Sequence, residues 1–183
     1  HPNSSIQSSM LNQENRNGNT FNGNAFVDIT FLKDFKFTFN VGTTVNEIRY
    51  YTTTNPYYGF GAEQNGTVTM YHYRTTTLNL QQILNYSHNF GKHNISVMLG
   101  HESYKYNYAE LSASKKNMFS YWGNHELNGA VIDGSSAASY SNDYNTEGYF
   151  FRALYDYDAK YYFSASYRRD ASSRFHPDNR WGN

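Results

Sequence analysis

The sequence lacks cysteine and is poor in proline and in charge. It contains no cysteine, 3 prolines and 16% charged residues among 183. Without cysteine, the chain cannot build disulfide scaffolds, cysteine zinc sites, thiol nucleophiles or iron–sulfur clusters. Lys+Arg 15 and Asp+Glu 15 balance to a net charge of zero, so the basic field of a typical nucleic-acid binder is missing. No segment approaches the roughly 18 consecutive apolar residues of a membrane-spanning helix.

Aromatic residues are abundant in a chain that is hydrophilic on average. Tyr 19, Phe 13 and Trp 2 make up 19% of the residues, yet the mean hydropathy is −0.80. The polar residues are mainly Asn, Ser and Thr. So many aromatics and so few prolines argue against a disordered chain. Because Tyr, Phe and Thr favour strands, the composition indicates an all-β protein.

Alternation of apolar and polar residues predicts about six strands. It is clearest at Phe35–Val45, where every second residue is apolar or Thr, a pattern that no helix can keep on one face. Similar alternation predicts strands around Val27–Phe31, Leu78–Tyr86, Ile95–Leu99, Tyr149–Tyr157 and Tyr161–Tyr167. Residues 1–23 are expected to be loop, and 47–68 and 109–145 to be long loops. Short turns are expected at Lys33-Asp34, Phe90–His93 and Asp158-Ala159.

The connections between these strands alternate between short and long. Outer-membrane barrels combine short periplasmic turns with long extracellular loops. About 9–11 residues cross the bilayer in such a strand, and Phe35–Val45 fits that length. Tyrosines beside the short turns are expected to form an interfacial aromatic girdle: Tyr86, Tyr155, Tyr157 and Tyr161. A soluble antiparallel sheet explains the alternation equally well, but it does not explain the order of the connections.

Six strands do not close a barrel comfortably, since the smallest common barrels have eight. Either two strands lie within the long loops, or the chain is an arc of a larger barrel. The chain opens on His1-Pro2-Asn3 without an initiator Met or a signal peptide and closes on Trp181-Gly182-Asn183. We therefore expect an internal piece of a larger protein, an arc rather than a closed barrel.

Motifs in residues 90–182 resemble those of one transporter family. The segment Tyr149–Tyr162 resembles the hairpin "YF.RL.Y.Y..KYY" of SusC/RagA-type TonB-dependent outer-membrane transporters. It leads into Arg168–Phe175, which resembles the family's "RRDGSSRF" with Ala171 in place of Gly. Asn179–Gly182 resembles "NRWG", and the segments 92–95 and 99–102 resemble "KHN(L/I)" and "LLGHE". Residues 24–90 resemble the family only in their general pattern and contain no matching motif.

The resemblance implies a large barrel of 22 strands with a plugged lumen. All 183 residues would form part of this single transmembrane domain, and the plug and the TonB-contacting segment would be absent from this chain. Such transporters import oligosaccharides, or peptides in some members, through the outer membrane of Gram-negative bacteria. Their partners are a SusD-like lipoprotein at the extracellular face, the TonB system, outer-membrane lipid and the remaining parts of the transporter. Neither an enzymatic activity, a cofactor nor a nucleic-acid partner is implied.

Two groups of residues are candidates for a role in transport. Polar residues on the strands are expected to face a wet lumen: Lys36, Asn40, Asn79, Gln81, Asn85, Arg152 and Arg168. Aromatic residues in the long loops are candidates for substrate contact, for docking of the lipoprotein lid, or for plain loop packing: Tyr57, Tyr58, Phe60, Phe119, Tyr121 and Trp122.

Other clusters of chemical groups have simpler structural interpretations. The motif residues are expected to form ion pairs and to cap a turn rather than to bind an anion: Arg168, Arg169, Asp170, Ser172, Ser173, Arg174 and Phe175. His88, His93, His101 and Glu102 do not converge as metal ligands must, so no metal site is expected. Asp156 and Asp158 are expected to cap a turn. No catalytic motif is found. The alternatives to a transporter are a secreted β-sandwich carbohydrate-binding module and a small eight-stranded outer-membrane barrel.

Overall fold

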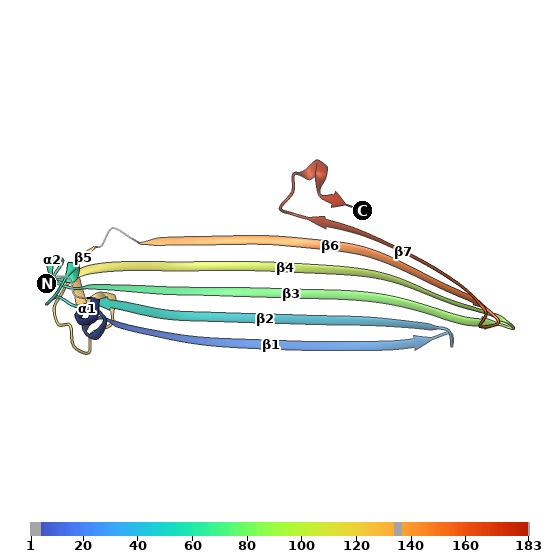
Figure 1. Cartoon of the computed structure of the whole chain (residues 1–183), viewed down its shortest axis with the longest axis horizontal. Coiled ribbons are helices and arrows are strands. Elements are labelled where there is room, and N and C mark those ends of the chain that lie inside the picture. The colour runs from blue at the N-terminus through green and yellow to red at the C-terminus, as the bar shows by residue number, and fades with distance from the viewer. Residues whose placement is uncertain (1–4, 134–136, 183) are drawn as a thin grey trace. The chain divides into compact units, whose positions relative to one another are not determined.

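The protein is built around a single sheet. A computed structural model describes residues 5–133 and 137–182. The sheet has eight strands in the order β1-β2-β3-β4-β6-β7-β8, with β5 paired to β4 (Figure 1). Six strands are long: β1 Gln13–Phe31, β2 Phe35–Thr54, β3 Thr67–Phe90, β4 His93–Met118, β6 Ala138–Tyr157 and β7 Tyr161–Ser172. Two are short, β5 Ala130–Asp133 and β8 Trp181–Gly182. The all-β fold class with about six antiparallel strands is confirmed.

Helices are few and short. They are α1 Ser5–Leu11 and α2 Phe60–Glu63, together with the 3₁₀ turns η1 Leu127–Gly129 and η2 Pro177–Asn179. Within the described ranges, none of these helices has the length and apolar character needed to cross a membrane.

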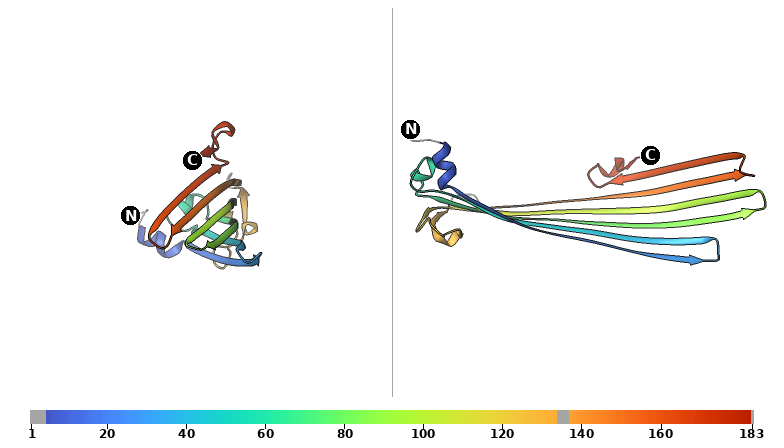
Figure 2. Two further views of the ribbon diagram at one scale, coloured as in Figure 1. Left: turned by 90° about the vertical axis from the view of Figure 1, so that its right-hand side faces the viewer. Right: turned by 60° about the horizontal axis from the view of Figure 1, so that its bottom comes forward.

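The chain divides into two compact units. Unit 1 comprises His1–Thr20, Val45–Thr75 and Tyr108–Asn142, and unit 2 comprises Phe21–Thr44, Thr76–Asn107 and Asp143–Asn183. Unit 1 contains the two long connections between strands, with α1, α2 and β5. Unit 2 contains the three short turns between the long strands (Figure 2). The alternation of short and long connections predicted from the sequence is therefore present.

Backbone conformation explains why the turns of unit 2 are tight. Leu32 and Lys33 have φ of 49° and 64°, and Asp158 and Ala159 have φ of 52° and 53°. Two successive residues with positive φ form the hairpin turn whose twist matches the flanking strands. Gly91, with φ of 62°, allows the middle turn. The first turn is centred on Leu32-Lys33, one residue before the predicted Lys33-Asp34, because the positive φ values begin at Leu32.

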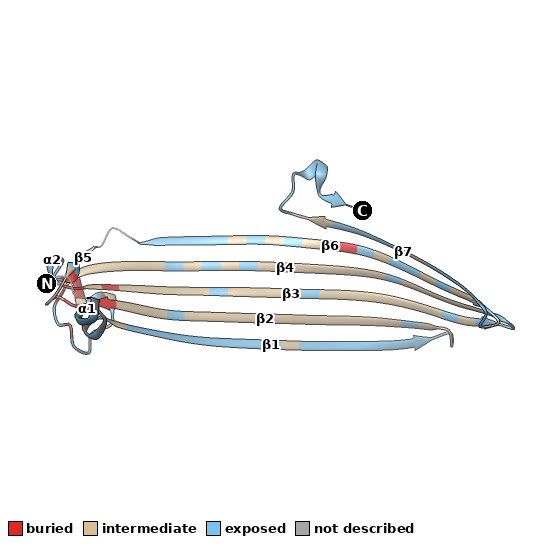
Figure 3. Cartoon of the chain, viewed as in Figure 1, coloured by how far each residue is buried: buried red, intermediate tan, exposed pale blue. Residues whose placement is uncertain are grey.

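Unit 2 has two contrasting sheet faces and no buried core. The register Phe151↔Tyr167 and Tyr155↔Phe163 aligns apolar side chains of β6 and β7 on one face. Phe151, Phe163 and Tyr167 are exposed and Tyr155 is half-buried. On the same face, Leu99 of β4 is 50% accessible, and Phe163 is 66% accessible. Every buried hydrophobic residue in the described part of the chain belongs to unit 1. The buried segment that Figure 3 shows on β6 is Gly148. The apolar face of unit 2 thus needs an environment other than water.

Unit 1 has a small core beneath its loops. Val68, Met118, Tyr121 and Ala130 are buried there, and Met70 and Leu127 pack against them. The hydroxyl of Tyr121 donates a hydrogen bond to the carbonyl oxygen of Leu11. The core therefore connects the loop 119–129 to the end of α1 and to strands β3 and β4.

The prediction that residues 1–23 form a loop is wrong for residues 5–11 and 13–23, and residues 1–4 lie outside the described part of the chain. Helix α1 ends at Leu11 and strand β1 begins at Gln13. The segment is polar on both faces, so its sequence has no hydrophobic alternation to reveal a strand. Contacts with β2 hold this strand in the sheet. Thr20 Oγ1 donates to Asn46 Oδ1 at 3.1 Å, and the Arg16 guanidinium lies 4.9 Å from the centre of the Tyr50 ring.

The long loops are shorter than the sequence indicates. Strand β2 continues to Thr54 and β3 begins at Thr67, while β4 continues to Met118 and β6 begins at Ala138. Polar, tyrosine-rich strand ends therefore occupy much of the segments 47–68 and 109–145. The reason is the same as for β1, since cross-strand contacts rather than hydrophobic alternation hold these ends in the sheet.

Candidate functional site

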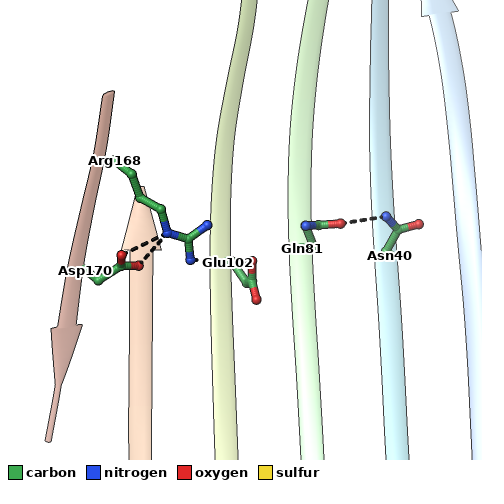
Figure 4. A network of polar contacts seen from close by, with 5 residues as sticks. All are labelled: Asn40, Gln81, Glu102, Arg168 and Asp170. Carbon is green, nitrogen blue, oxygen red and sulfur yellow. Dashed lines mark hydrogen bonds and ion pairs between the residues drawn. The ribbon is translucent and has the colours of Figure 1, made fainter. Parts of the chain in front are cut away.

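The residues predicted to face a lumen share one face of unit 2, which we call the polar face. Asn40 Nδ2 donates to Gln81 Oε1 at 3.0 Å across β2 and β3 (Figure 4). Lys36 Nζ lies 3.3 Å from Asp28 Oδ2. Strand alternation places the other predicted residues on this same face: Asn79, Asn85, Arg152 and Arg168. That this face lines a lumen remains a prediction.

Arg168 is the centre of a charged group on the polar face. Its Nε donates to Asp170 Oδ2 at 2.8 Å, and its Nη2 lies 3.9 Å from Glu102 Oε2 (Figure 4). The guanidinium also lies over the Phe150 ring, 5.6 Å from its centre. That ring covers Gly100, where an added Cβ would overlap it. The guanidinium is thus already paired with carboxylates and a ring, as expected of a structural group.

The remaining motif residues make local contacts in unit 2. Ser172 Oγ accepts from Arg174 N at 3.3 Å and so caps the turn that follows β7. Ser173 Oγ accepts instead from Asn145 N of β6 at 2.8 Å and ties the turn to that strand. Arginine side chains lie over aromatic rings: Arg169 over Trp181 at 5.3 Å and Arg174 over Tyr144 at 3.9 Å. Phe175 is exposed. A structural role for the motif remains a prediction.

The histidines of unit 2 are dispersed rather than gathered. His88 Nδ1 lies 2.8 Å from Asp34 Oδ2, and His93 Nδ1 lies 2.6 Å from the Tyr155 hydroxyl. His101 lies between Gln82 and Glu147, with 2.7 Å to each oxygen. Among the residues whose placement is described, no three His, Asp or Glu side chains form a group that could hold a metal ion.

Asp156 and Asp158 serve the last hairpin turn of unit 2. Asp156 Oδ1 accepts from Asn94 Nδ2 at 2.8 Å and from Ala159 N at 3.4 Å. Asp158 Oδ2 lies 3.1 Å from Lys160 Nζ and 3.8 Å from Lys92 Nζ. The carboxylates therefore cap and pair locally, as their position beside a turn predicts.

The apolar face of unit 2 carries a groove of about 410 Å³. Its walls are aromatic and aliphatic side chains of five strands, with His101 and Gln82 at its polar margin. Tyr149, which lines it, stacks on Trp181 with 5.9 Å between ring centres. Amphipathic rings beside an exposed apolar surface are typical of a membrane interface.

The six candidate loop aromatics of unit 1 differ in exposure. Tyr121 is 2% exposed and belongs to the core, so its ring offers no surface to a ligand or a lid. Tyr58 is half-buried. The other four are exposed: Tyr57, Phe60, Phe119 and Trp122. Two of these rings flank Tyr121, with ring centres 6.2 Å away for Tyr57 and 5.2 Å for Trp122. Contact with substrate or lid remains a prediction for the exposed four and for Tyr58.

A buried asparagine organises the loop that bears Tyr57. Asn55 is buried, and its N and Nδ2 donate to Asn12 Oδ1 at 2.9 and 2.8 Å. Its Oδ1 accepts from Tyr57 N at 3.0 Å and from Tyr58 N at 2.7 Å. A Cβ at Gly61 would overlap the Asn55 carbonyl oxygen, which explains a glycine there. Sequence reasoning did not single out Asn55, because nothing in the sequence shows that Asn12 lies beside it.

Sequence reasoning also missed a cluster of tyrosines on one face of unit 1. Tyr50 and Tyr71 stack with 4.4 Å between ring centres. Tyr73 lies 6.0 Å from Tyr108, and Tyr108 lies 6.1 Å from Tyr140. Burial raises the pKa of Tyr50. The spacing of two residues between Tyr71 and Tyr73 could have indicated a shared face. We call these five residues the tyrosine face.

The opposite face of unit 1 is charged. Glu47 Oε1 lies 2.7 Å from His72 Nε2, and Arg74 Nη2 donates to Glu47 Oε2 at 3.0 Å. The hydrogen bond with His72, followed by that with Arg74, lowers the pKa of the Glu47 carboxyl. Tyr51, next to Tyr50 in the chain, stacks instead on His125 at 4.4 Å.

Similarity to known proteins is consistent with the motifs. No protein-family model matches the sequence. The chain is 29% identical over 175 residues to the TonB-dependent receptor P3 of Formosa agariphila, and this match covers 92% of this chain and 17% of the relative. It is 27% identical over 180 residues to the TonB-dependent receptor SusC of Bacteroides thetaiotaomicron, covering 94% of this chain and 17% of the relative. The chain thus spans about a sixth of these relatives' length.

Solved structures agree on the fold. The RagAB peptide transporter matches with a TM-score of 0.86 and 23% identity, over 95% of this chain and 20% of that chain. The RagAB peptide importer in its closed-closed state matches with a TM-score of 0.84 and 24% identity, over 94% and 19% of the two chains. These comparisons confirm the resemblance to SusC/RagA-type TonB-dependent transporters and the fold of a barrel portion.

Proposed function

We propose that this chain forms barrel wall and extracellular loops of a TonB-dependent outer-membrane active transporter. The transporter imports oligosaccharides or peptides together with a SusD-like surface lipoprotein. The observation that carries the proposal is the two-faced sheet of unit 2. One face exposes large apolar side chains such as Leu99 and Phe163, while the other holds hydrogen-bonded polar pairs such as Asn40 and Gln81. Lipid on one side and a wet lumen on the other account for both faces.

The two units have different tasks in this proposal. Unit 2 crosses the membrane, with its turns on the periplasmic side. Unit 1 carries the loops on the extracellular side, where the exposed Tyr57, Phe60, Phe119 and Trp122 are available to substrate or lipoprotein. Plug and TonB-contacting segments belong to other parts of the transporter, and movement of the plug releases substrate to the periplasm. Transport needs neither a covalent step nor a cofactor.

Sequence relatives support the transporter class, and the two possible cargoes have separate support. The relatives are named TonB-dependent receptors, and one is SusC. The fold neighbours are named peptide transporters or importers, which makes peptides the second candidate cargo. A tyrosine-rich, nearly neutral surface on unit 1 favours the oligosaccharide.

Uptake by whole cells tests the proposal. The gene that encodes this chain is deleted in the producing bacterium and restored on a plasmid, with and without TonB. Growth on single glycans and on peptide digests as sole nutrients is measured. We expect at least one nutrient to support growth only when both the transporter and TonB are present. Growth on every nutrient independent of TonB would contradict the proposal.

A further inference from the structure

The apolar face of unit 2 has rings and polar groups at both of its ends. Beside the short turns, His93 Nδ1 lies 2.6 Å from the Tyr155 hydroxyl, and the centres of the His93 and Tyr157 rings are 5.0 Å apart. At the far end of the same face, the centres of the His101 and Tyr149 rings are 4.7 Å apart. Between these ends, the residues of β4 and β6 on this face are all apolar. An apolar band between two belts of rings is typical of a sheet that spans a membrane.

The far end of this face, which we call the distal belt, consists of five residues: His101, Glu147, Tyr149, Arg169 and Trp181. His101 comes eight residues after His93, the first residue of β4. With a rise of about 3.3 Å per residue and a tilt of about 40°, this separation is about 20 Å along the axis of a barrel. The apolar band of such a barrel is about 25 Å tall. The distal belt therefore lies at the membrane interface opposite the short turns, which is the outer leaflet if those turns are periplasmic.

Contacts across three strands hold the distal belt together. Glu147 Oε1 lies 2.7 Å from His101 Nε2 and accepts a hydrogen bond from the Tyr149 hydroxyl at 3.1 Å. Tyr149 also stacks on Trp181. Arg169 lies directly opposite Tyr149 in the register of β6 and β7, and its guanidinium is 5.3 Å from the centre of the Trp181 ring. These contacts place the guanidinium on the same face as the groove that Tyr149 lines.

Arg169 is a cation of the distal belt without a carboxylate partner. Glu147 is held by His101 and Tyr149, and Asp170 pairs with Arg168 on the polar face. Within residues 5–133 and 137–182, no Asp or Glu forms an ion pair with Arg169. The side chain is exposed. A guanidinium in this setting is suited to a phosphate group, which it binds through two parallel hydrogen bonds.

The groove of about 410 Å³ joins the distal belt to the apolar band. It is lined by His101 and Tyr149 of the belt and by Leu84, Leu99 and Phe151 of the band. Its volume is in the range of ligand sites. Its apolar walls are suited to a hydrocarbon chain, which gains free energy by covering them.

One kind of molecule satisfies both parts of this surface. A soluble anion would pair with Arg169 but would leave the apolar walls of the groove uncovered. A purely apolar molecule would cover the walls but would leave the guanidinium without an anion. A lipid with an anionic headgroup does both, and basic residues at a membrane surface recognise such headgroups. In the outer leaflet of a Gram-negative outer membrane, the lipid of this kind is a phosphorylated glycolipid.

We propose that the groove and the distal belt form a binding site for a phosphorylated glycolipid of the outer leaflet. An acyl chain lies in the groove, and Arg169 binds a phosphate of the headgroup. The inference rests on the proposed function, which places unit 2 in the membrane. It concerns neither the cargo nor the lipoprotein, and it assigns one lipid to one site rather than general contact with the bilayer.

Two variants and two matched controls separate the headgroup contact from the acyl-chain contact. Arg169→Gln removes the charge of an exposed side chain, and Arg49→Gln makes the same change at an exposed arginine of unit 1. Leu99→Phe fills part of the groove. Val97→Phe places the same ring two residues away on the same face of β4, at a position that does not line the groove.

Binding is measured by native mass spectrometry on the complete transporter purified in detergent. The probes are lipid A, lipid A without its phosphates, phosphatidylglycerol and inorganic phosphate, and the melting temperature of each variant is recorded. We expect lipid A to bind most tightly and Arg169→Gln to weaken its binding about tenfold. Leu99→Phe should weaken it about fivefold, and the two control variants should stay within about twofold. Lipid A without phosphates should bind the wild type and Arg169→Gln equally, and inorganic phosphate should not displace lipid A.

Four results would overturn the inference: Arg169→Gln binds lipid A as tightly as the wild type, removal of the phosphates leaves affinity unchanged, phosphatidylglycerol binds as tightly as lipid A, or inorganic phosphate alone displaces lipid A. Equal weakening by Leu99→Phe and Val97→Phe would show that the groove does not hold the chain. The cell assay distinguishes these failures from failure of the proposed function. If TonB-dependent growth persists while lipid A binds without preference, the transporter stands and only the lipid site falls.

Discussion

The two units of the chain differ in whether their apolar side chains are buried or exposed. Unit 1 buries a few of them, including Val68 and Tyr121, in a core of its own. Among its described residues, unit 2 buries no hydrophobic side chain and leaves residues such as Leu99 and Phe163 exposed. A core of its own is what a water-exposed region needs, whereas a large exposed apolar surface indicates contact with a membrane, a ligand or another protein. The difference supports the proposed function, in which unit 2 is the membrane-facing part of the chain.

Of the changes considered, removal of Tyr121 should lower stability most. The loss should be confined to unit 1. Tyr121→Ala deletes a buried ring and its hydrogen bond to Leu11. Truncation of buried aromatic residues costs about 3–5 kcal/mol. Hydrogen exchange of the amides in 119–131 should report this loss as faster local opening. Trp122→Ala, at an exposed neighbouring ring, is the control and should change exchange little; equal effects of the two variants would refute a core role for Tyr121.

A positive charge should distinguish the two faces of unit 2. Leu99→Arg places a charge on the apolar face, and its cost should be about 2–4 kcal/mol if that residue lies near the bilayer midplane. Asn79→Arg places the same charge on the polar face, where water is available. Folded yield in the outer membrane and unfolding of the reconstituted transporter in urea both measure the difference. If the two variants are equally stable, the assignment of the faces is wrong.

Loss of Asn55 should loosen the first long loop by a smaller amount. Asn55→Ala removes the acceptor for Tyr57 N and Tyr58 N and one donor to Asn12. Loss of buried hydrogen-bond partners costs about 1–3 kcal/mol. Proteolysis within 56–66 should accelerate, and the hairpin turns of unit 2 should be unaffected. Gln64→Ala, an exposed position in the same loop, should not accelerate it; if both variants are cleaved equally fast, Asn55 does not organise the loop.

The smallest effect should come from pH acting on Glu47. Because the folded-state pKa of Glu47 is lowered from its ordinary value of 4.5, its charged form stabilises unit 1 above that pH. This contribution is lost as the pH falls below 4.5 through the lowered pKa. Glu47→Gln should therefore be less stable than the wild type at neutral pH and nearly equal to it in acid, as followed by thermal unfolding. A wild-type minus Glu47→Gln difference in stability that does not change with pH would contradict the role of Glu47.

Local sequence patterns are sufficient to predict a strand where one of its faces is apolar. Alternation at Phe35–Val45 and Tyr149–Tyr157 predicted strands that are present, and the polar partners Asn40, Gln81 and Arg168 were assigned to one common face. The pattern failed for Gln13–Thr20, where both faces are polar and only contacts with β2 hold the strand. Hydrophobic periodicity cannot report a strand that buries nothing apolar.

The sequence by itself determined the class of the molecule. An all-β chain, alternating short and long connections, and a resemblance to SusC/RagA-type transporters follow from residue order, because alternation and turn chemistry are local properties. Tertiary structure decided which aromatics are available. It buried Tyr121, left Trp122 exposed, and brought Tyr73, Tyr108 and Tyr140 together from three strands. Burial and cross-strand proximity depend on register between segments far apart in the chain, and no local pattern encodes them.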